Sequence, residues 1–332
     1  MGVPHRWLLV LAVVGVSLLV GTLPAAGQQR NPLQKIGQTV ADGPSPHYQF
    51  QQFTVSSEDQ SRTWRGHLGI PKTEAPDLGF PSFWMLDGNA ALMEFDQTLL
   101  AELAAQAAPP ALVFIGYDND LRIDSPARTR DYTPALTPPS STVQGQQPTG
   151  GADAFLEIIE RKIRPELFGR AKLNPERQAI WGHSLGGLFV LHTCFTRTGA
   201  FQTYVAGSPS MWWGGGHAAQ AAERFVAHHA GHPAKIVIHL GGAERIGDRG
   251  DRDLTDPRVV EHLKRLQAAP PDAAWQLAKR LQDVAGLRVS YREFAGLGHG
   301  PMFRASLLAG LHEVTGIEDR SATPRPSQLS GE

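Results

Sequence analysis

Residues Ile180-Trp181-Gly182-His183-Ser184-Leu185-Gly186-Gly187-Leu188 contain a Gly-x-Ser-x-Gly pentapeptide. The residues before it, 178–181, predict a short buried strand, and the apolar residues after it, 188–195, predict a buried helix. A serine at such a strand-to-helix turn is typical of a nucleophile elbow, which lifts the serine oxygen into an open site. Glycines are needed because strand and helix approach too closely for a Cβ. The sequence therefore predicts Ser184 as a nucleophile; the alternative is an ordinary glycine-rich turn.

Strands alternate with helices on either side of this turn. The expected strands are residues 50–55, 64–70, 83–86, 112–117, 204–206, 235–240 and 287–294, and the expected helices are 95–107, 153–168 and 301–315. The alternation predicts an α/β fold with a mostly parallel sheet and helices on both faces. The first two strands predict an antiparallel hairpin, and residues 134–151, rich in Pro, Ser, Gln and Gly, predict a long surface loop.

The N-terminal residues have the layout of a secretory signal peptide. Arg6 is followed by an apolar stretch, residues 7–20, and then by small residues up to Gly27. The alternative is an uncleaved membrane anchor, but the apolar stretch is shorter than the roughly 20 residues that span a bilayer comfortably. We therefore expect cleavage after Gly27 and an exported protein, periplasmic or secreted, with no membrane association afterwards.

Length and charge fit one exported α/β domain. The chain has 332 residues, a formal net charge of −1 and a single cysteine, Cys194, in a helix-like apolar segment. The charge does not favour nucleic acid as a partner, and one cysteine cannot form an intrachain disulfide. We expect a signal peptide at residues 1–27, one domain at 46–317 and a disordered tail at 318–332; the oligomeric state stays open.

A nucleophilic serine needs a base, and in enzymes with this elbow the partners follow in the order serine, acid, histidine. His299 lies in Gly296-Leu297-Gly298-His299-Gly300, directly after the last expected strand, and is the expected base. His183 fills a variable position of the pentapeptide and is expected to line the site. The neighbouring histidines 228, 229 and 232 predict a solvated helix end rather than a metal site.

The acid is expected in the loop after the strand at 235–240. Glu244 comes first in this loop and is our choice, with Asp248 and then Asp251 as alternatives. Its task would be to orient His299 and to stabilise the imidazolium form. In the remaining alternative these carboxylates are solvated and the enzyme works with serine and histidine alone.

Attack on an ester produces an oxyanion that requires two backbone N–H donors. We expect one from Leu185, which follows the nucleophile, and the other from Asn89, in the loop after the strand at 83–86. Asp87 in the same loop would either brace it through hydrogen bonds or touch the substrate.

At this point the sequence resembles a known family. The residues that carry the resemblance are Leu86-Asp87-Gly88-Asn89, Arg128-Thr129-Arg130-Asp131-Tyr132-Thr133-Pro134, Gly150-Gly151-Ala152-Asp153-Ala154-Phe155, Gly182-His183-Ser184-Leu185-Gly186-Gly187-Leu188 and Ser208-Pro209-Ser210-Met211-Trp212-Trp213. They are similar, in this order, to the "putative esterase" branch of the α/β-hydrolase superfamily, and within it to periplasmic enterobactin and salmochelin esterases. The resemblance runs from about residue 48 to residue 311.

The resemblance implies an α/β-hydrolase fold and roles for particular residues. Ser184 and His299 match the family's nucleophile and base. Arg128 matches an arginine near the active site, which would either bind an anionic or catecholate group of the substrate or form a structural salt bridge, with Asp131 as the suggested partner. Trp212 and Trp213 match a tryptophan pair near the site, of which one would line a substrate pocket. Some such esterases use a serine–histidine dyad, which leaves the role of Glu244 open.

Together these observations predict an exported serine esterase that hydrolyses carboxylic esters of small molecules through an acyl-enzyme on Ser184, with siderophore trilactones as candidate substrates. We expect no metal or organic cofactor, although a ferric siderophore would bring iron as part of the substrate. The alternatives are an acyltransferase or a general carboxylesterase with the same site, and a non-catalytic binding protein.

Overall fold

The computed structural model describes residues 31, 33–136, 148–245, 255, 260, 264 and 268–316. The predicted signal peptide, the predicted tail and residues 137–147 of the predicted loop lie outside these residues. Within the described ranges, no helix is both long enough and apolar enough to cross a lipid bilayer.

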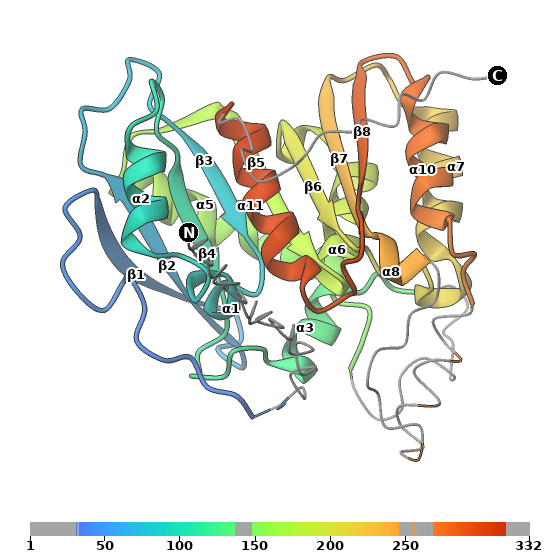
Figure 1. Ribbon diagram of the computed structural model, residues 1–332, viewed down its shortest axis with the longest axis horizontal. Coiled ribbons are helices and arrows are strands. Elements are labelled where there is room, and N and C mark those ends of the chain that lie inside the picture. Colours follow the sequence, from blue (N-terminus) through green and yellow to red (C-terminus); the bar gives the residue numbers. More distant parts are fainter. Residues whose placement is uncertain are drawn as a thin grey trace, which may run out of the picture. The chain divides into compact units, whose positions relative to one another are not determined.

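The described strands form one eight-stranded sheet in the order β1-β2-β4-β3-β5-β6-β7-β8 (Figure 1). Their bounds are β1 Tyr48–Ser56, β2 Thr63–Pro71, β3 Phe80–Met85, β4 Ala111–Ile115, β5 Leu173–His183, β6 Thr203–Gly207, β7 Ala234–Gly241 and β8 Leu287–Phe294. β1 pairs antiparallel with β2, and β2 antiparallel with β4, whereas all other neighbours are parallel. The mostly parallel sheet and the N-terminal hairpin are therefore confirmed.

Helices cover both faces of this sheet. Their bounds are α1 Gly88–Leu92, α2 Gln97–Ala104, α3 Ser125–Tyr132, α4 Ala152–Ile158, α5 Arg164–Arg170, α6 Leu185–Thr196, α7 His217–His228, α8 Gly242–Arg245, α10 Ala273–Gln282 and α11 Met302–Thr315, with a π-helix η1 Ile159–Ile163 and 3₁₀ turns η2 Thr198–Ala200 and η3 Trp213–Gly215. Residues of α1, α2 and α11 share one apolar core, and residues of α4 to α7 and α10 share another.

The alternation of side chains along each strand explains why the sheet has a separate core on each face. In β3 the side chain of Trp84 belongs to one core, while its neighbours Phe83 and Met85 belong to the other, because successive side chains of a strand point to opposite faces. β3 is buried along its whole length, as expected for a parallel strand covered on both sides. Figure 1 shows α2 and α11 on one side of the sheet and α5 and α6 on the other.

Several elements differ from the sequence-based expectation. β5 is 11 residues long, whereas only residues 178–181 were predicted as a strand. Its first half is mostly polar and lacks the alternation of apolar and polar side chains that indicates a strand. The helix predicted at 153–168 is divided into α4, η1 and α5. The sequence analysis missed α3, which is mostly polar, and α7 and α10, whose apolar residues are largely alanines.

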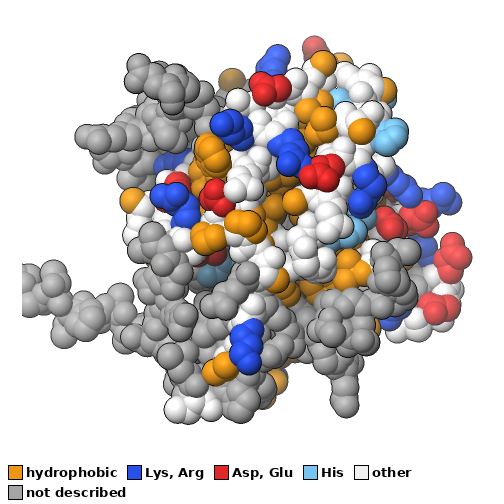
Figure 2. Space-filling view, turned by 90° about the vertical axis from the view of Figure 1, so that its right-hand side faces the viewer, with side chains coloured by type: hydrophobic (Ala, Val, Ile, Leu, Met, Phe, Trp, Pro, Cys, Tyr) orange, Lys and Arg blue, Asp and Glu red, His pale blue; other side chains and the backbone are white. Residues whose placement is uncertain are grey.

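The edge strand β8 carries charged side chains. Arg288 and Glu293 are exposed, and Arg292 is half-buried, and such charges discourage pairing with another chain's strand. Figure 2 shows the side of the molecule that lies on the right in Figure 1: acidic and basic side chains lie beside one another among hydrophobic ones. This mixture of signs agrees with the small net charge of the chain.

Candidate active site

Ser184 lies between β5 and α6, in the middle of the sheet. Its backbone has φ 62° and ψ −117°, a strained conformation for a residue with a Cβ. The turn is held by two backbone hydrogen bonds, from Ser184 N to the Gly207 carbonyl at 2.9 Å and from Ser210 N to the Ser184 carbonyl at 3.1 Å. A Cβ on Gly182 would lie 2.5 Å from backbone atoms of Gly186, so this glycine is a steric requirement of the turn.

His299 reaches Ser184 from the loop after the edge strand β8. It lies in the loop between β8 and α11, and its Nε2 is 3.0 Å from Ser184 Oγ. The loop is tied to the end of β7 by a hydrogen bond from Ala243 N to the Leu297 carbonyl. Serine and imidazole are thus within hydrogen-bonding distance, the geometry that lets an imidazole take the serine proton.

Glu244, in α8 after β7, contacts the other nitrogen of the same imidazole. Its Oε2 lies 2.5 Å from His299 Nδ1, and its Oε1 accepts hydrogen bonds from Ser208 Oγ at 2.6 Å and Gly241 N at 3.1 Å. Burial raises the pKa of Glu244, but His299, Ser208 and Gly241 together outweigh it, so the pKa lies below its usual value. The alternatives Asp248 and Asp251 lie outside the described residues.

The turn after β6 contacts both Glu244 and Ser184. Ser208 donates to Glu244, and Ser210 Oγ lies 3.3 Å from Ser184 Oγ. Both serines are buried, and Ser208 has φ 41°. The sequence analysis missed these roles. The sequence feature that could have indicated them is a Ser-Pro-Ser directly after a strand. In a parallel sheet this position lies at the carboxyl edge, where ligands bind.

The expected oxyanion donors begin two helices. Leu185 is the first residue of α6, and Asn89 is the second residue of α1, so both backbone N–H groups belong to first turns that lack intrahelical acceptors. The side chain of Asn89 donates to the carbonyls of Asn119 and Leu121 at 3.0 and 2.9 Å, which anchors α1. Gly88, which begins α1, offers a further N–H of this kind.

Arg128 joins the two helix starts. Its guanidinium binds both carboxylate oxygens of Asp87, at 2.9 and 3.0 Å, and donates to the His183 carbonyl at 3.1 Å. Burial lowers the pKa of Arg128, but the Asp87 carboxylate more than compensates, and the pKa is raised. Because the side chains of Arg128 and Asp87 are only 12% and 2% exposed, the ion pair braces the loop before α1 from within the protein.

The suggested salt bridge between Arg128 and Asp131 is wrong. Asp131 instead accepts from Arg62 Nη2 at 2.5 Å and from Trp64 Nε1 at 2.9 Å. Arg128 and Asp131 are three residues apart on α3, and the helix turns them to different neighbours: Arg128 toward the loop after β3, and Asp131 toward β2.

The two tryptophans have different surroundings. Trp213 is completely buried in the core, and its ring centroid lies 6.1 Å from that of Trp212, so Trp213 is the member of the pair that cannot line a substrate pocket. Trp212 is half-buried at the edge of this core and remains a candidate. The ring of His183 lies 4.6 Å from that of His299, between it and Phe303.

The histidines at 228, 229 and 232 lie at the end of α7 and in the loop that follows. Within the described ranges, no three His, Cys, Asp or Glu side chains lie close enough together to hold a metal ion. The Ser184–His299–Glu244 arrangement can perform acyl transfer with side chains and backbone N–H groups alone.

The sheet and the site define an α/β-hydrolase-type esterase, and comparison with known proteins identifies its family. The model of the family described as "Putative esterase" matches residues 59–314. The chain therefore belongs to this esterase family and is a carboxylic-ester hydrolase.

Named relatives are about 30% identical to the chain over the aligned residues. The chain is 31% identical over 302 residues to the apo-salmochelin esterase of Escherichia coli O6:H1, covering 90% of this chain and 89% of the relative. It is 30% identical over 260 residues to the ferri-bacillibactin esterase BesA of Bacillus subtilis, covering 74% and 82%. Among solved structures, the enterobactin and salmochelin hydrolase IroE aligns with a TM-score of 0.65 at 29% identity, covering 83% of this chain and 99% of that one.

Proposed function

We propose that this esterase is exported, works through an acyl-enzyme on Ser184 and opens the ester bonds of a siderophore trilactone. The observation that carries the mechanism is the pair of contacts that His299 makes, 3.0 Å to Ser184 Oγ and 2.5 Å to Glu244 Oε2. The substrate class is supported by the names of the relatives, which act on salmochelin and bacillibactin.

In the proposed first step, Ser184 Oγ attacks the ester carbonyl and His299 Nε2 takes the serine proton. Glu244 keeps the proton of His299 on Nδ1, so that Nε2 is free to accept, and it stabilises the imidazolium that forms. The N–H groups of Leu185 and Asn89 would hold the oxyanion. His299 then gives its proton to the leaving alcohol, and the acyl group stays on the serine.

In the proposed second step, His299 takes a proton from water, which attacks the acyl-enzyme and releases the acid and Ser184. Arg128 is assigned to bracing the oxyanion loop rather than to binding substrate, since both of its nitrogens that face Asp87 are already engaged. Trp212 and His183 are proposed as walls of the substrate site.

The test is hydrolysis of an ester panel by the mature protein and by Ser184→Ala. The panel contains p-nitrophenyl acetate, p-nitrophenyl butyrate, and apo- and ferric enterobactin. We expect rapid trilactone opening and slow simple-ester turnover, both reduced about a thousandfold or more in Ser184→Ala. Rapid turnover of the simple esters with an untouched trilactone would instead leave a general carboxylesterase.

The acyl-enzyme and the export have separate tests. A serine-directed fluorophosphonate should add its mass to the wild-type protein and not to Ser184→Ala. Expression with the native N-terminus should yield a protein that begins at Gln28, as mass spectrometry of the secreted or periplasmic fraction would show. A protein that keeps residues 1–27 would contradict export with cleavage.

A further inference from the structure

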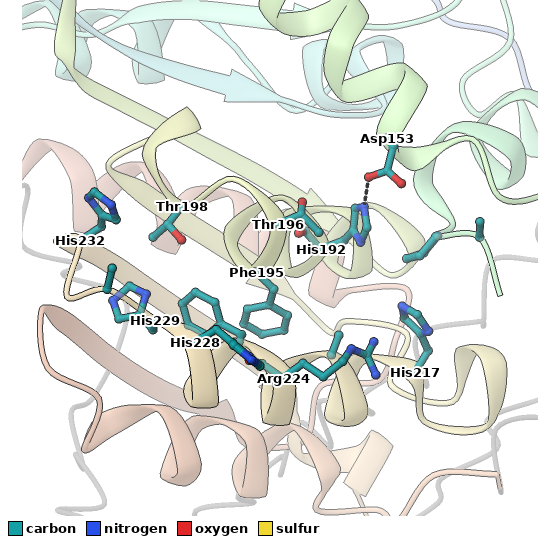
Figure 3. Close-up of a pocket in the computed structure, with 15 residues that line it drawn as sticks. Asp153, His192, Phe195, Thr196, Thr198, His217, Arg224, His228, His229 and His232 are labelled. Atoms are coloured by element: carbon teal, nitrogen blue, oxygen red, sulfur yellow. Dashed lines mark hydrogen bonds and ion pairs between the residues drawn. The ribbon is translucent and has the colours of Figure 1, made fainter. Parts of the chain in front are cut away.

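A cavity of about 410 Å³ lies away from the proposed catalytic residues. It is formed between the C-terminal half of α6 and the length of α7, and closed by the loop after α7 (Figure 3). Neither Ser184 nor His299 lines it. Its volume falls within the range of about 300–1,000 Å³ that is typical of small-molecule sites.

Two aromatic rings that contact each other line this cavity. Phe195 of α6 and Phe225 of α7 have ring centroids 5.1 Å apart, and the ring of His229 lies 4.6 Å from that of Phe225. Figure 3 shows Phe195 at the centre, between the histidines of the loop on one side and Arg224 with His217 on the other. A flat apolar group would bury its face against these rings.

One end of the cavity has an excess of cationic and donor groups. Arg224 and His217 come from α7 and lie beside each other in Figure 3. Among the described residues, no carboxylate forms an ion pair with Arg224. The nearest lining carboxylate, Asp153, is already bound to His192 Nε2 at 2.8 Å. The planar guanidinium fork of Arg224 is thus available to an anion from outside the protein.

From this arrangement we propose that the cavity binds a small aryl carboxylate. Its carboxylate lies at Arg224 and His217, and its ring lies against Phe195 and Phe225. A metal ion is a poorer match, because no three potential ligands among the described residues are close enough to share one. The site is separate from Ser184, so the assignment goes beyond ester hydrolysis and stands or falls independently of it.

The charges around the cavity predict that binding strengthens as the pH falls. The groups that face it are Asp153 from α4, His192 from α6, His217, Arg224 and His228 from α7, and His229 and His232 from the loop. Burial lowers the pKa of His217, the charges of His192 and Arg224 lower it further, and Asp153 opposes them. A bound carboxylate stabilises protonated His217, so binding is coupled to proton uptake.

The experiment is titration calorimetry of the mature protein with 2-naphthoate at pH 5.5 and pH 8. We expect 2-naphthoate to bind about tenfold more tightly at pH 5.5, and the uncharged 2-naphthamide to bind much more weakly than the acid. Arg224→Gln should weaken naphthoate binding about tenfold or more, and Arg224→Lys less, because lysine keeps the charge without the fork. His217→Gln should remove most of the pH dependence.

His232→Gln is the matched control, because His232 lines the opposite end of the cavity. The affinity of this variant for 2-naphthoate should differ less than twofold from that of the wild-type protein. Hydrolysis of p-nitrophenyl acetate should be the same in Arg224→Gln as in the wild-type protein, which also reports that the variant is folded. The proposal is overturned if naphthoate does not bind at millimolar concentration, or if it binds equally well to Arg224→Gln. It is also overturned if labelling of the nucleophile by a fluorophosphonate abolishes naphthoate binding.

Discussion

At the scale of single residues, the candidate site depends on which nitrogen of His299 carries the proton. Ser184 can give up its proton only to an unprotonated Nε2, so the other proton must sit on Nδ1. Glu244 lies 2.5 Å from Nδ1, and a carboxylate can only accept a hydrogen bond there. The pKa of Glu244 is held below its usual value, so it remains an acceptor throughout the neutral range.

Glu244→Gln should therefore lower kcat by about 10²–10⁴-fold with little change in KM. The glutamine amide has nearly the same shape but can donate to Nδ1, which favours the tautomer with a proton on Nε2. Steady-state kinetics on p-nitrophenyl acetate would measure the loss. A loss of less than tenfold would show that serine and histidine work as a dyad and that Glu244 is dispensable.

Ser208 is the residue that holds Glu244 in place. Its hydroxyl donates to Oε1 of Glu244 at 2.6 Å, and it is buried. Ser208→Ala should lower kcat about tenfold, since one hydrogen bond to a charged group contributes about 1.5–3 kcal/mol. It should also move the acid limb of the kcat–pH profile upward, because a carboxylate that has lost this donor stabilises the protonated form of the neighbouring base more strongly.

Ser208→Cys fills nearly the same space but donates only weakly, so it is the control that should reproduce the shift in the pH profile. If Ser208→Ala lowers kcat but leaves the acid limb in place, the serine acts on the fold of the turn and not on the carboxylate of Glu244.

At the scale of elements, the site is a row of strand ends. β3, β5, β6, β7 and β8 are parallel neighbours, so their carboxyl ends meet at one edge of the sheet. The loops after them carry, in this order, Asp87, Ser184, Ser208, Glu244 and His299. Each loop supplies at least one polar side chain, and the sheet sets the spacing between them.

The elbow depends on one of its two motif glycines more than on the other. A Cβ on Gly182 would lie 2.5 Å from the backbone of Gly186, whereas a Cβ on Gly186 would meet nothing closer than Leu86 Cδ1 at 3.6 Å. Gly182→Ala should thus destabilise the fold by several kcal/mol or prevent folding, and Gly186→Ala should fold with a melting temperature within a few degrees of the wild type. Thermal unfolding by circular dichroism compares the two; equal destabilisation would contradict the steric argument.

At the scale of the whole molecule, His239 is the least exposed of the buried histidines among the described residues. His239 of β7 is 2% exposed, and its Nδ1 lies 3.1 Å from Ser306 Oγ, which also accepts a hydrogen bond from Trp181 Nε1. Burial and the charge of Arg292 lower the pKa of His239 to about 3, with Ser306 opposing them. The folded protein therefore keeps this imidazole neutral in mild acid, whereas the unfolded chain protonates it near its ordinary pKa.

Between the ordinary histidine pKa of about 6.5 and the folded value, the unfolded chain binds the extra proton. The free energy of unfolding must fall as the pH falls through this window, by up to about 1.4 kcal/mol per pH unit from this residue. His239→Gln should flatten the dependence of urea unfolding on pH from 6.5 to 4. His228→Gln, on the exposed end of α7, should not; an unchanged slope in His239→Gln would contradict the assignment.

Much of the fold was predictable because its signals are local. The period of two in the hairpin, the apolar runs of β4 and β7, and the glycines of the elbow each lie within a few consecutive residues. The helix α3 was missed because it is short and mostly polar, and α7 and α10 were missed because small alanine side chains make up much of their buried faces. Such segments are stabilised as helices by the neighbours that cover those faces.

Ser184 as the expected nucleophile, His299 as its expected base and ester hydrolysis as the reaction were predicted from the sequence by itself. The strand–turn–helix motif lies in consecutive residues, and its partners are expected in a fixed order along the chain. Only the tertiary structure decided which carboxylate faces the imidazole, that Arg128 pairs with Asp87 and that Trp213 is core. Ser184 and His299 are 115 residues apart, and His299 and Glu244 are 55 apart. Contacts at such separations depend on the order of the strands in the sheet, which no short stretch of sequence records.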